Sequence, residues 1–196
     1  MATNLEFKAH CQSFESLYPK LAELKAVHRE TINQIDTYFY VTPVKDSSIL
    51  EVCKPRLKLR EIRETGEGWL IYYERPNKNE SRYSQYQLSE VTNPSTLKTL
   101  LTAALSVEVI VQKQREVWMF NNTRIHLDRV ADLGHFIELE TVFQGQTEAE
   151  AINEHQQVKN ILHLDTADPV AVSYSDLVQA LQAGFETPPA RGLRKS

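Results

Sequence analysis

The chain has 196 residues but only six glycines and two cysteines. Neither the P-loop pattern nor the GxGxxG pattern occurs among its glycines, and no serine-nucleophile elbow is present. Any phosphate group would therefore have to be bound by side chains. Cys11 and Cys53 lack metal-ligand spacing. They predict two reduced, partly buried thiols in a cytosolic protein.

Long apolar runs are also missing. No run is long enough to span a bilayer, and residues 1–15 carry charges where a signal peptide would have an apolar core. We therefore expect a cytoplasmic protein with no membrane partner. The net charge of −4 gives no basic footprint, which argues against a nucleic-acid partner. An acidic chain can still contain a concentrated internal basic patch.

What the chain does contain is charge that alternates with period two. Arg56, Lys58 and Arg60 fall on one face of an expected strand, whereas Leu57 and Leu59 fall on the other. A solvated strand face usually mixes acidic, basic and hydroxyl residues. A purely basic row therefore indicates a face that binds something negatively charged.

A second strand carries the opposite sign. Glu138 and Glu140 share one face, and Ile137 and Leu139 share the other. Like charges two residues apart repel each other unless an opposite charge lies between them. Acidic and basic rows in one chain thus predict a sheet that encloses a charged interior, which suits a metal ion together with a polyanion.

The remaining periodicity predicts the fold. Helices are expected at 13–28, 94–105, 148–162 and 175–183, with a capping box formed by Thr147 and Glu150, and residues 42–55 are expected to form a loop. Strands are expected at residues 4–10, 34–41, 56–63, 69–75, 82–88, 107–120, 123–130 and 136–143.

Hairpin-linked strands make an antiparallel sheet, and eight of them can close into a barrel. We expect an α+β fold: a closed eight-stranded antiparallel tunnel with a charged interior, covered outside by about four helices. Residues 1–185 should form a single domain, and residues 186–196 a disordered tail.

The charged rows supply the candidate site residues. Hard cations such as Mg²⁺ or Mn²⁺ take carboxylate oxygens, and phosphates are bound by cations from several directions. The candidate metal ligands are Glu6, Asp128, Glu138 and Glu140. The candidate triphosphate-binding residues are Lys8, Lys58, Arg60, Arg75, Lys113 and Arg124. Among these residues, Lys8, Arg60 and Glu138 are assigned the catalytic roles.

Three further residues allow two interpretations each. His126 shares the face of Arg124 and Asp128, so it can line the tunnel or make a structural hydrogen bond. Arg115 can reach a phosphate or form a salt bridge at the rim. Asp36 can face the tunnel or cap a turn, and we expect the turn.

At the level of motifs, the chain resembles the CYTH family, also called the triphosphate tunnel metalloenzymes, and is most similar to its class IV adenylyl cyclase branch. The resemblance rests on these segments: Asn4-Leu-Glu-Phe-Lys8, Gln34-Ile-Asp-Thr-Tyr-Phe39, Arg56-Leu-Lys-Leu-Arg60, Tyr73-Glu-Arg-Pro76 and the segment 126–140. It implies the same tunnel, metal ligands and triphosphate-binding residues. Asn4 departs from the family pattern, which has glutamate at this position.

The function expected from this resemblance is that of a metal-dependent enzyme acting on the triphosphate of a nucleotide, converting ATP to cyclic AMP and pyrophosphate. One alternative is a triphosphatase that hydrolyses an organic or inorganic triphosphate. Another is a module that binds nucleotide or polyphosphate without turning it over, which Asn4 keeps open. The expected partner is a nucleoside triphosphate or another polyphosphate, and a homodimer is left open.

Overall fold

The structure is a computed structural model, and it describes residues 2–41, 53–76, 82–167 and 169–185. Its strands are β1 (Ala2–Cys11), β2 (Val27–Phe39), β3 (Cys53–Ile62), β4 (Gly68–Pro76), β5 (Arg82–Val91), β6 (Val107–Phe120), β7 (Thr123–Val130) and β8 (Gly134–Val142). Its helices are α1 (Tyr18–Glu23), α2 (Pro94–Ala104), α3 (Glu148–Ile161) and α4 (Tyr174–Gln182). The eight antiparallel strands and the four helices agree with the prediction.

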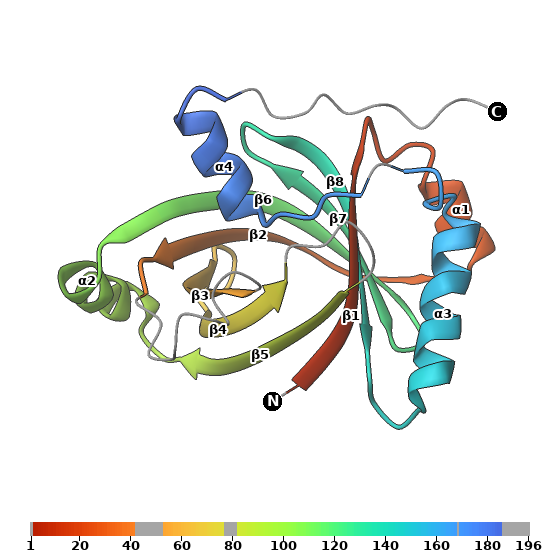
Figure 1. Cartoon of the computed structure of the whole chain (residues 1–196), viewed down its shortest axis with the longest axis horizontal. Helices are drawn as coiled ribbons and strands as arrows, with labels where there is room; N and C mark the ends of the chain where they lie inside the picture. Colours follow the sequence, from red (N-terminus) through yellow and green to blue (C-terminus); the bar gives the residue numbers. More distant parts are fainter. Residues whose placement is uncertain (1, 42–52, 77–81, 168, 186–196) are drawn as a thin grey trace.

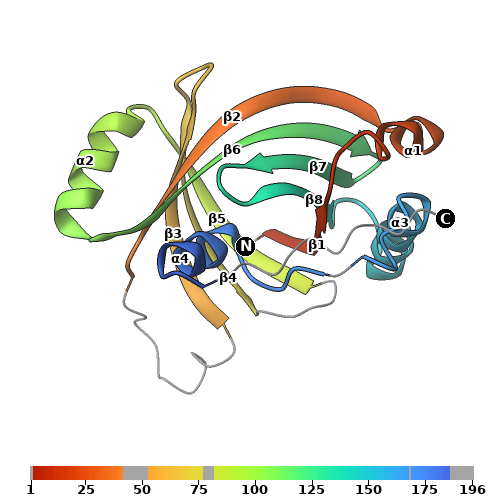
Figure 2. The ribbon, with the colours of Figure 1, turned by 90° about the horizontal axis from the view of Figure 1, so that it is seen from above.

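The strands form one strongly curled sheet (Figures 1 and 2). Their order is β1-β5-β4-β3-β2-β6-β7-β8, and β1 also pairs with β8. The seam between β1 and β5 spans only Ala2–Glu6, whereas β2 pairs with β6 over Val27–Phe39. The antiparallel eight-stranded sheet is therefore as predicted, but it is curled into a half-barrel joined by one short strand pairing, instead of the fully closed tunnel that the sequence predicts.

The largest difference from the prediction lies near the start of the chain. The helix expected at 13–28 is only Tyr18–Glu23, and β2 begins several residues earlier than expected. The helix ends because Lys25 adopts a left-handed conformation with φ of 59°, and the amide of Ala26 donates to the carbonyl of Leu21. This is a Schellman termination, which glycine usually provides. Because lysine occupies the position here, the sequence carried no stop signal.

Some of the predicted segments lie wholly or largely outside the described residues. They are the tail 186–196, most of the loop 42–55 and most of the turn 76–79. The last part of that loop is described, and it belongs to β3, which starts at Cys53.

Helix caps are set locally, as the sequence indicates. The Asn93 side chain accepts a hydrogen bond at the start of α2, and Thr147 and Glu150 form the predicted capping box of α3. A second capping box, formed by Ser173 and Asp176, begins α4 one residue earlier than expected. This cap has a consequence for the site, because it fixes where the first turn of α4 enters the interior.

The main apolar core lies outside the curled sheet. The odd-numbered residues of β1, β7 and β8 point away from the interior and pack with α1 and α3; Phe7, Ile125 and Leu139 are almost fully buried there. Each such side chain contributes about 1.5–3 kcal/mol by its removal from water. Cys11 lies in the same core, where burial raises the pKa of its thiol to about 12. The helices thus allow the inner face of the sheet to remain polar.

A second apolar cluster fills one end of the interior. Tyr174, Leu177 and Val178 of α4 pack against Val109 and Val111 of β6. The helix therefore lies across this end of the curled sheet (Figure 2).

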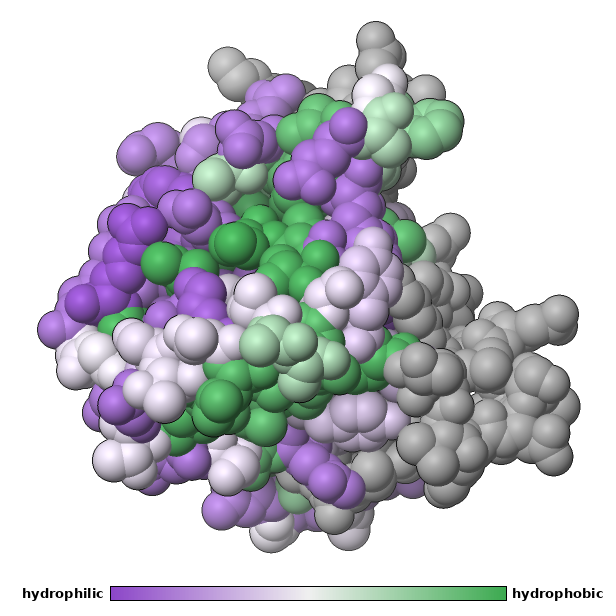
Figure 3. Space-filling view, turned by 90° about the vertical axis from the view of Figure 1, so that its left-hand side faces the viewer, coloured by the Kyte–Doolittle hydropathy of each residue, from purple (hydrophilic) through white to green (hydrophobic). Residues whose placement is uncertain are grey.

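Helix α2 lies on the surface and has no buried residue. Figure 3 views the side of the molecule that carries α2 and shows apolar residues gathered across the middle of this face, with polar residues around them. Leu100 of α2 is 61% exposed. None of the described helices has the length and hydropathy of a membrane-spanning segment.

Candidate functional site

The interior holds a cavity to which every one of the eight strands contributes a side chain. Its lining follows the period of two along each strand: Asn4, Glu6 and Lys8 come from β1, and Lys58 and Arg60 come from β3. Ser173 and Tyr174, at the start of α4, complete it at one end. Polar side chains converge here because the sheet curls its charged face inward.

The first charged centre is built around Asp36 of β2, which is 1% exposed. Lys58 Nζ donates to Asp36 Oδ2 at 2.8 Å, and Arg60 donates to both carboxylate oxygens at 2.7 and 2.8 Å. Lys113 Nζ lies 3.9 Å from Oδ2. Three cations therefore share one carboxylate. We call this group, Asp36 with Lys58, Arg60 and Lys113, the cation centre.

The surplus of positive charge shows in the protonation equilibria. Burial, followed by the neighbouring Arg60, lowers the pKa of Lys58 to about 7. Burial, followed by Arg115, lowers the pKa of Lys113 to about 8. Burial alone would raise the pKa of Asp36, but Arg60 and Lys58 hold it well below its ordinary value. The carboxylate stays ionised, and the two lysines lack enough negative charge to stay fully protonated.

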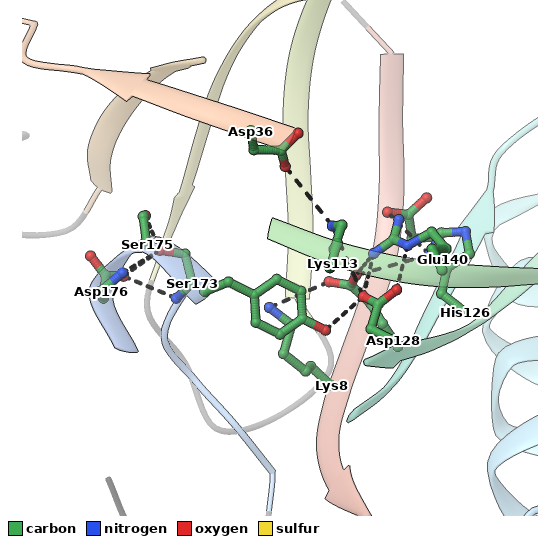
Figure 4. Close-up of polar contacts among 12 residues, drawn as sticks. Lys8, Asp36, Lys113, His126, Asp128, Glu140, Ser173, Ser175 and Asp176 are labelled. Carbon is green, nitrogen blue, oxygen red and sulfur yellow. Dashed lines mark hydrogen bonds and ion pairs between the residues drawn. The ribbon is translucent and has the colours of Figure 1, made fainter. Parts of the chain in front are cut away.

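Next to the cation centre, a group of ion pairs is built around Asp128 of β7, which is fully buried. Arg115 donates to both of its oxygens at 2.6 Å, and the Tyr174 hydroxyl donates to Oδ2 at 2.8 Å. Figure 4 shows Lys113 between Asp36 and Asp128, and its Nζ lies 4.0 Å from Asp128 Oδ2. Although burial works in the other direction, Arg115 and Lys113 lower the pKa of Asp128.

Beyond Asp128, the two glutamates of β8 face the same interior. Glu138 accepts a hydrogen bond from Arg115 at 2.7 Å, and its other oxygen lies 3.5 Å from Lys8 Nζ. Glu140 forms a longer ion pair of 3.6 Å with Arg124, whose side chain is 44% exposed. Glu6 lies directly opposite Glu140 in the strand register. Two like charges in neighbouring strands repel each other in the absence of a cation.

His126 completes this group. Its Nδ1 lies 3.9 Å from a Glu138 oxygen and 4.0 Å from a Glu140 oxygen. One donor atom from each of His126, Glu138 and Glu140 lies within 4.8 Å of the others, a spacing that can hold a metal ion. We call these three residues, with the adjoining Glu6, the carboxylate centre.

Two polar atoms at this centre are left over. Asn4 Oδ1 and His126 Nδ1 are buried without a hydrogen-bond partner among the described residues. A buried polar atom that lacks a partner costs about 1–3 kcal/mol. Asn4 lines the cavity, so a ligand there can supply the contact that its amide oxygen lacks.

The β4–β5 side of the cavity is chemically different. Ile71 and Tyr73 of β4 pair in register with Leu88 and Tyr86 of β5, and all four line the cavity. Ile71 is also the direct neighbour of Lys58 across the β3–β4 pair. Leu88 is 57% exposed although it faces the cavity. We call these four residues the apolar wall.

Most of the predicted site residues lie in or at the cavity. Those that line it are Glu6, Lys8, Lys58, Arg60, Lys113, Arg124, Glu138 and Glu140. Asp128 lies just beneath this lining and accepts hydrogen bonds from Arg115. Arg75 lies in β4, but its side chain falls outside the described residues.

Sequence reasoning misjudged Asp36, which faces the cations of the tunnel instead of capping a turn. It gave no role to Tyr174 and left Arg115 undecided, although both hold Asp128. Arg56, the third member of the basic row, pairs with Asp176 of α4 at 2.6 Å. A local pattern could not show these contacts, because their partners come from distant strands or from α4.

Fold and site together define a protein whose curled antiparallel sheet encloses opposed charged centres. The chain belongs to the CYTH family: its sequence matches the CYTH domain over residues 2–174. No curated protein matches the chain.

Several solved structures share the fold. The PH1012 protein from Pyrococcus horikoshii OT3 is similar with a TM-score of 0.73 and 24% identity, covering 89% of this chain and 98% of that one. A putative adenylate cyclase from Vibrio parahaemolyticus has a TM-score of 0.68 and 19% identity, covering 90% and 98%. A putative adenylyl cyclase from Hippeastrum, described as revealing a dominant triphosphatase activity, has a TM-score of 0.60 and 14% identity, covering 96% and 98%.

Proposed function

We propose that this protein is a metal-dependent enzyme that acts on the triphosphate of a nucleotide. The observation that carries the proposal is the cation centre, where Lys58, Arg60 and Lys113 share the carboxylate of Asp36 beside the cavity of the curled sheet. Buried cations in excess are costly unless an anion joins them. A triphosphate chain carries several negative charges along its length, so it can contact all three cations at once.

Binding would exchange one set of partners for another. Phosphate oxygens would accept hydrogen bonds from Lys58 and Arg60, which now donate to Asp36. Lys113 lies between Asp36 and Asp128, so it can serve phosphates in the middle of the tunnel. Lys8 holds Glu138 and would neutralise charge at the other end. Such a site works by positioning and charge neutralisation.

The donor set of the carboxylate centre fits a dication. His126, Glu138 and Glu140 have converging donor atoms, and Asn4 adds a buried amide oxygen without a partner among the described residues. When bound, Mg²⁺ or Mn²⁺ would polarise the phosphate and offset the charge of the departing group. Asp128 has Arg115 and Tyr174 on its oxygens, so its proposed role is to hold Arg115 against Glu138.

For the chemistry, the first candidate is a cyclase-like reaction. The ribose 3′-oxygen would attack the α-phosphorus, the bond to the bridging oxygen would break, and pyrophosphate would leave. Lys8 and Arg60 would stabilise the charge of the leaving group, and Glu138 would hold Lys8 and Arg115 in place. The likeness to a putative adenylate cyclase from Vibrio parahaemolyticus supports this direction.

The apolar wall supports a nucleotide over inorganic tripolyphosphate. Inorganic tripolyphosphate has no apolar surface to place against Ile71 and Leu88, whereas a nucleobase has a planar face that can stack on Tyr73 or Tyr86. The wall begins beside Lys58, where a phosphate would end and an organic group begin.

A triphosphatase is the second candidate. In that reaction, water would attack the γ-phosphorus, and a diphosphate would leave. The Hippeastrum relative, described as a putative cyclase that reveals a dominant triphosphatase activity, supports it. The third candidate, binding without turnover, is supported by Asn4, which brings no charge to the carboxylate centre.

The test is to incubate the protein with ATP and either Mg²⁺ or Mn²⁺ and identify products by ³¹P NMR. Cyclic AMP with pyrophosphate identifies a cyclase, and ADP with phosphate identifies a triphosphatase. ATP that binds but remains intact points to a binding module. ATP that neither binds nor reacts contradicts the whole proposal.

A further inference from the structure

The carboxylate centre contains a histidine whose contacts no structural role explains. His126 is 3% exposed, and its Nδ1 makes no hydrogen bond within the described part of the chain. His155 offers a comparison, because it is equally buried, at 2% exposed, and its Nδ1 lies 2.9 Å from the Thr141 hydroxyl. His155 Nδ1 thus has a short hydrogen-bond contact, whereas the described partners of His126 Nδ1 are the two longer ion-pair contacts to Glu138 and Glu140.

The donor atoms around His126 Nδ1 lie close enough together to bind one shared metal ion. Carboxylate oxygens of Glu138 and Glu140 lie 3.9 and 4.0 Å away, too far for hydrogen bonds. Donor atoms that each lie about 2.1 Å from one ion are about 3.0 Å apart when adjacent in an octahedron and about 4.2 Å apart when opposite. The three donor atoms here lie within 4.8 Å of one another, so a bound ion would draw them together.

The polar contacts around this group also suit metal ligands. Arg115 and Lys8 hold the Glu138 carboxylate in position, as outer-shell partners of ligating carboxylates do. Asn4 lies on the same strand face as Glu6, and in the strand register it pairs with Val142, two residues beyond Glu140. Its buried amide oxygen has no hydrogen-bond partner in the described residues.

We propose that His126 is a metal ligand and that the site formed with Glu138 and Glu140 selects a transition-metal dication over Mg²⁺. Imidazole nitrogen suits the first-row transition dications, whereas Mg²⁺ prefers an all-oxygen octahedron with several waters. The neutral Asn4 removes charge that would favour Mg²⁺, and His126 adds a nitrogen donor that favours the alternative. This inference rests on the proposed function, because the selected ion would serve the same phosphates.

The test measures metal binding without substrate. Calorimetric titration of the intact protein with Mn²⁺, Zn²⁺ and Mg²⁺ gives the three dissociation constants for the wild type and for His126→Gln. We expect Mn²⁺ and Zn²⁺ to bind at least tenfold more tightly than Mg²⁺ in the wild type. In His126→Gln, their affinity should fall about tenfold or more, while that of Mg²⁺ changes little. His28→Gln, at an exposed position of β2, is the matched control and should behave as the wild type.

A spectroscopic measurement avoids any question about the folding of the variant. Pulsed electron paramagnetic resonance of Mn²⁺ bound to the wild type should show coupling to a ¹⁴N nucleus, and labelling histidine with ¹⁵N should change that pattern. Unchanged metal selectivity in folded His126→Gln, or Mn²⁺ without nitrogen coupling, would overturn the role of His126 alone. Triphosphate turnover with Mg²⁺ would then still stand, so the two failures are distinguishable.

Discussion

The two charged centres of the tunnel carry excess charge of opposite sign. In the cation centre, Lys58, Arg60 and Lys113 share one carboxylate, and both lysines have a lowered pKa. In the carboxylate centre, acidic side chains gather with His126, and unpartnered polar atoms remain there among the described residues. Lys113, Asp128 and Arg115 join the two. The first centre is incomplete without an anion and the second without a cation.

The difference between the two centres should change most when Asp36 is removed. Asp36→Ala leaves three buried cations without their shared counter-charge, and the loss of one partner from a buried ion pair costs about 3–5 kcal/mol of unfolding free energy. Added tripolyphosphate should restore most of that loss, because it supplies the missing negative charge. Urea unfolding with and without tripolyphosphate measures both effects.

Asp128→Ala is the matched control for that experiment. It should also destabilise the protein, because Arg115 loses two hydrogen bonds. Tripolyphosphate should restore less of the lost stability, because Arg115 still donates a hydrogen bond to Glu138. Equal recovery of both variants would mean that the two centres do not differ as described.

In the carboxylate centre, the two β8 glutamates should respond differently to substitution. Glu140→Ala should remove the stabilisation that Mn²⁺ provides, about 2.7 kcal/mol at a hundredfold excess over Kd. Without metal its stability should hold or rise slightly, because Glu140 faces Glu6 and its ion pairs are long, at 3.6 Å to the half-exposed Arg124 and 4.0 Å to His126. Thermal melts with and without Mn²⁺ test both expectations.

Glu138→Ala should also lose the metal response, but it should be less stable than the wild type without metal. Its carboxylate holds Arg115 and Lys8, which would be left with fewer partners. The sequence alone predicts the same behaviour for both glutamates, and the structure separates them. Either variant keeping the full Mn²⁺ stabilisation would contradict the assignment.

The cation centre also predicts a pH dependence. Burial and Arg60 lower the pKa of Lys58 to about 7, so in the free protein this lysine is already partly deprotonated at pH 7 and loses the remaining proton as the pH rises to 9. A bound triphosphate raises that pKa, so binding takes up protons, and ATP affinity should fall about tenfold over this range. Calorimetry at pH 8 in two buffers of different ionisation enthalpy measures the uptake. Lys58→Met should reduce it, and proton release by the wild type would contradict the account.

The smallest expected effect is at Asn4. Asn4→Glu adds a carboxylate on the strand face of Glu6, where water screens charge poorly, and should tighten Mn²⁺ binding about tenfold. Without metal, the added repulsion should destabilise the protein slightly. Gln112→Glu adds the same charge at an exposed position of β6 and should leave affinity unchanged. Unaltered affinity in Asn4→Glu would place residue 4 away from the metal.

The sequence predicts the parts of this molecule that depend on local period and local chemistry. The basic row of β3 and the acidic row of β8 face inward because period two forces each row onto one face. The capping box of Thr147 and Glu150 likewise needs only neighbouring residues. The end of α1 was missed because Lys25 does there what glycine usually does.

Long-range pairing could not be predicted in the same way. Asp36 meets Arg60 only because β2 and β3 pair in a particular register. Tyr174 meets Asp128 because α4 folds back over the interior. Neither relation leaves a periodic signal in the chain. They decide which predicted cations already have partners.

The most direct test of the central claim is titration of wild type, Lys58→Ala and Arg60→Ala with ATP, tripolyphosphate and AMP. The account predicts that each substitution costs about 1.5–3 kcal/mol of binding free energy for the two triphosphates and much less for AMP. Lys98→Ala removes a partly buried partner of Glu61 outside the cavity, and this variant should bind all three ligands as the wild type does. Equal losses for ATP, tripolyphosphate and AMP would show that the cation centre does not bind a triphosphate chain.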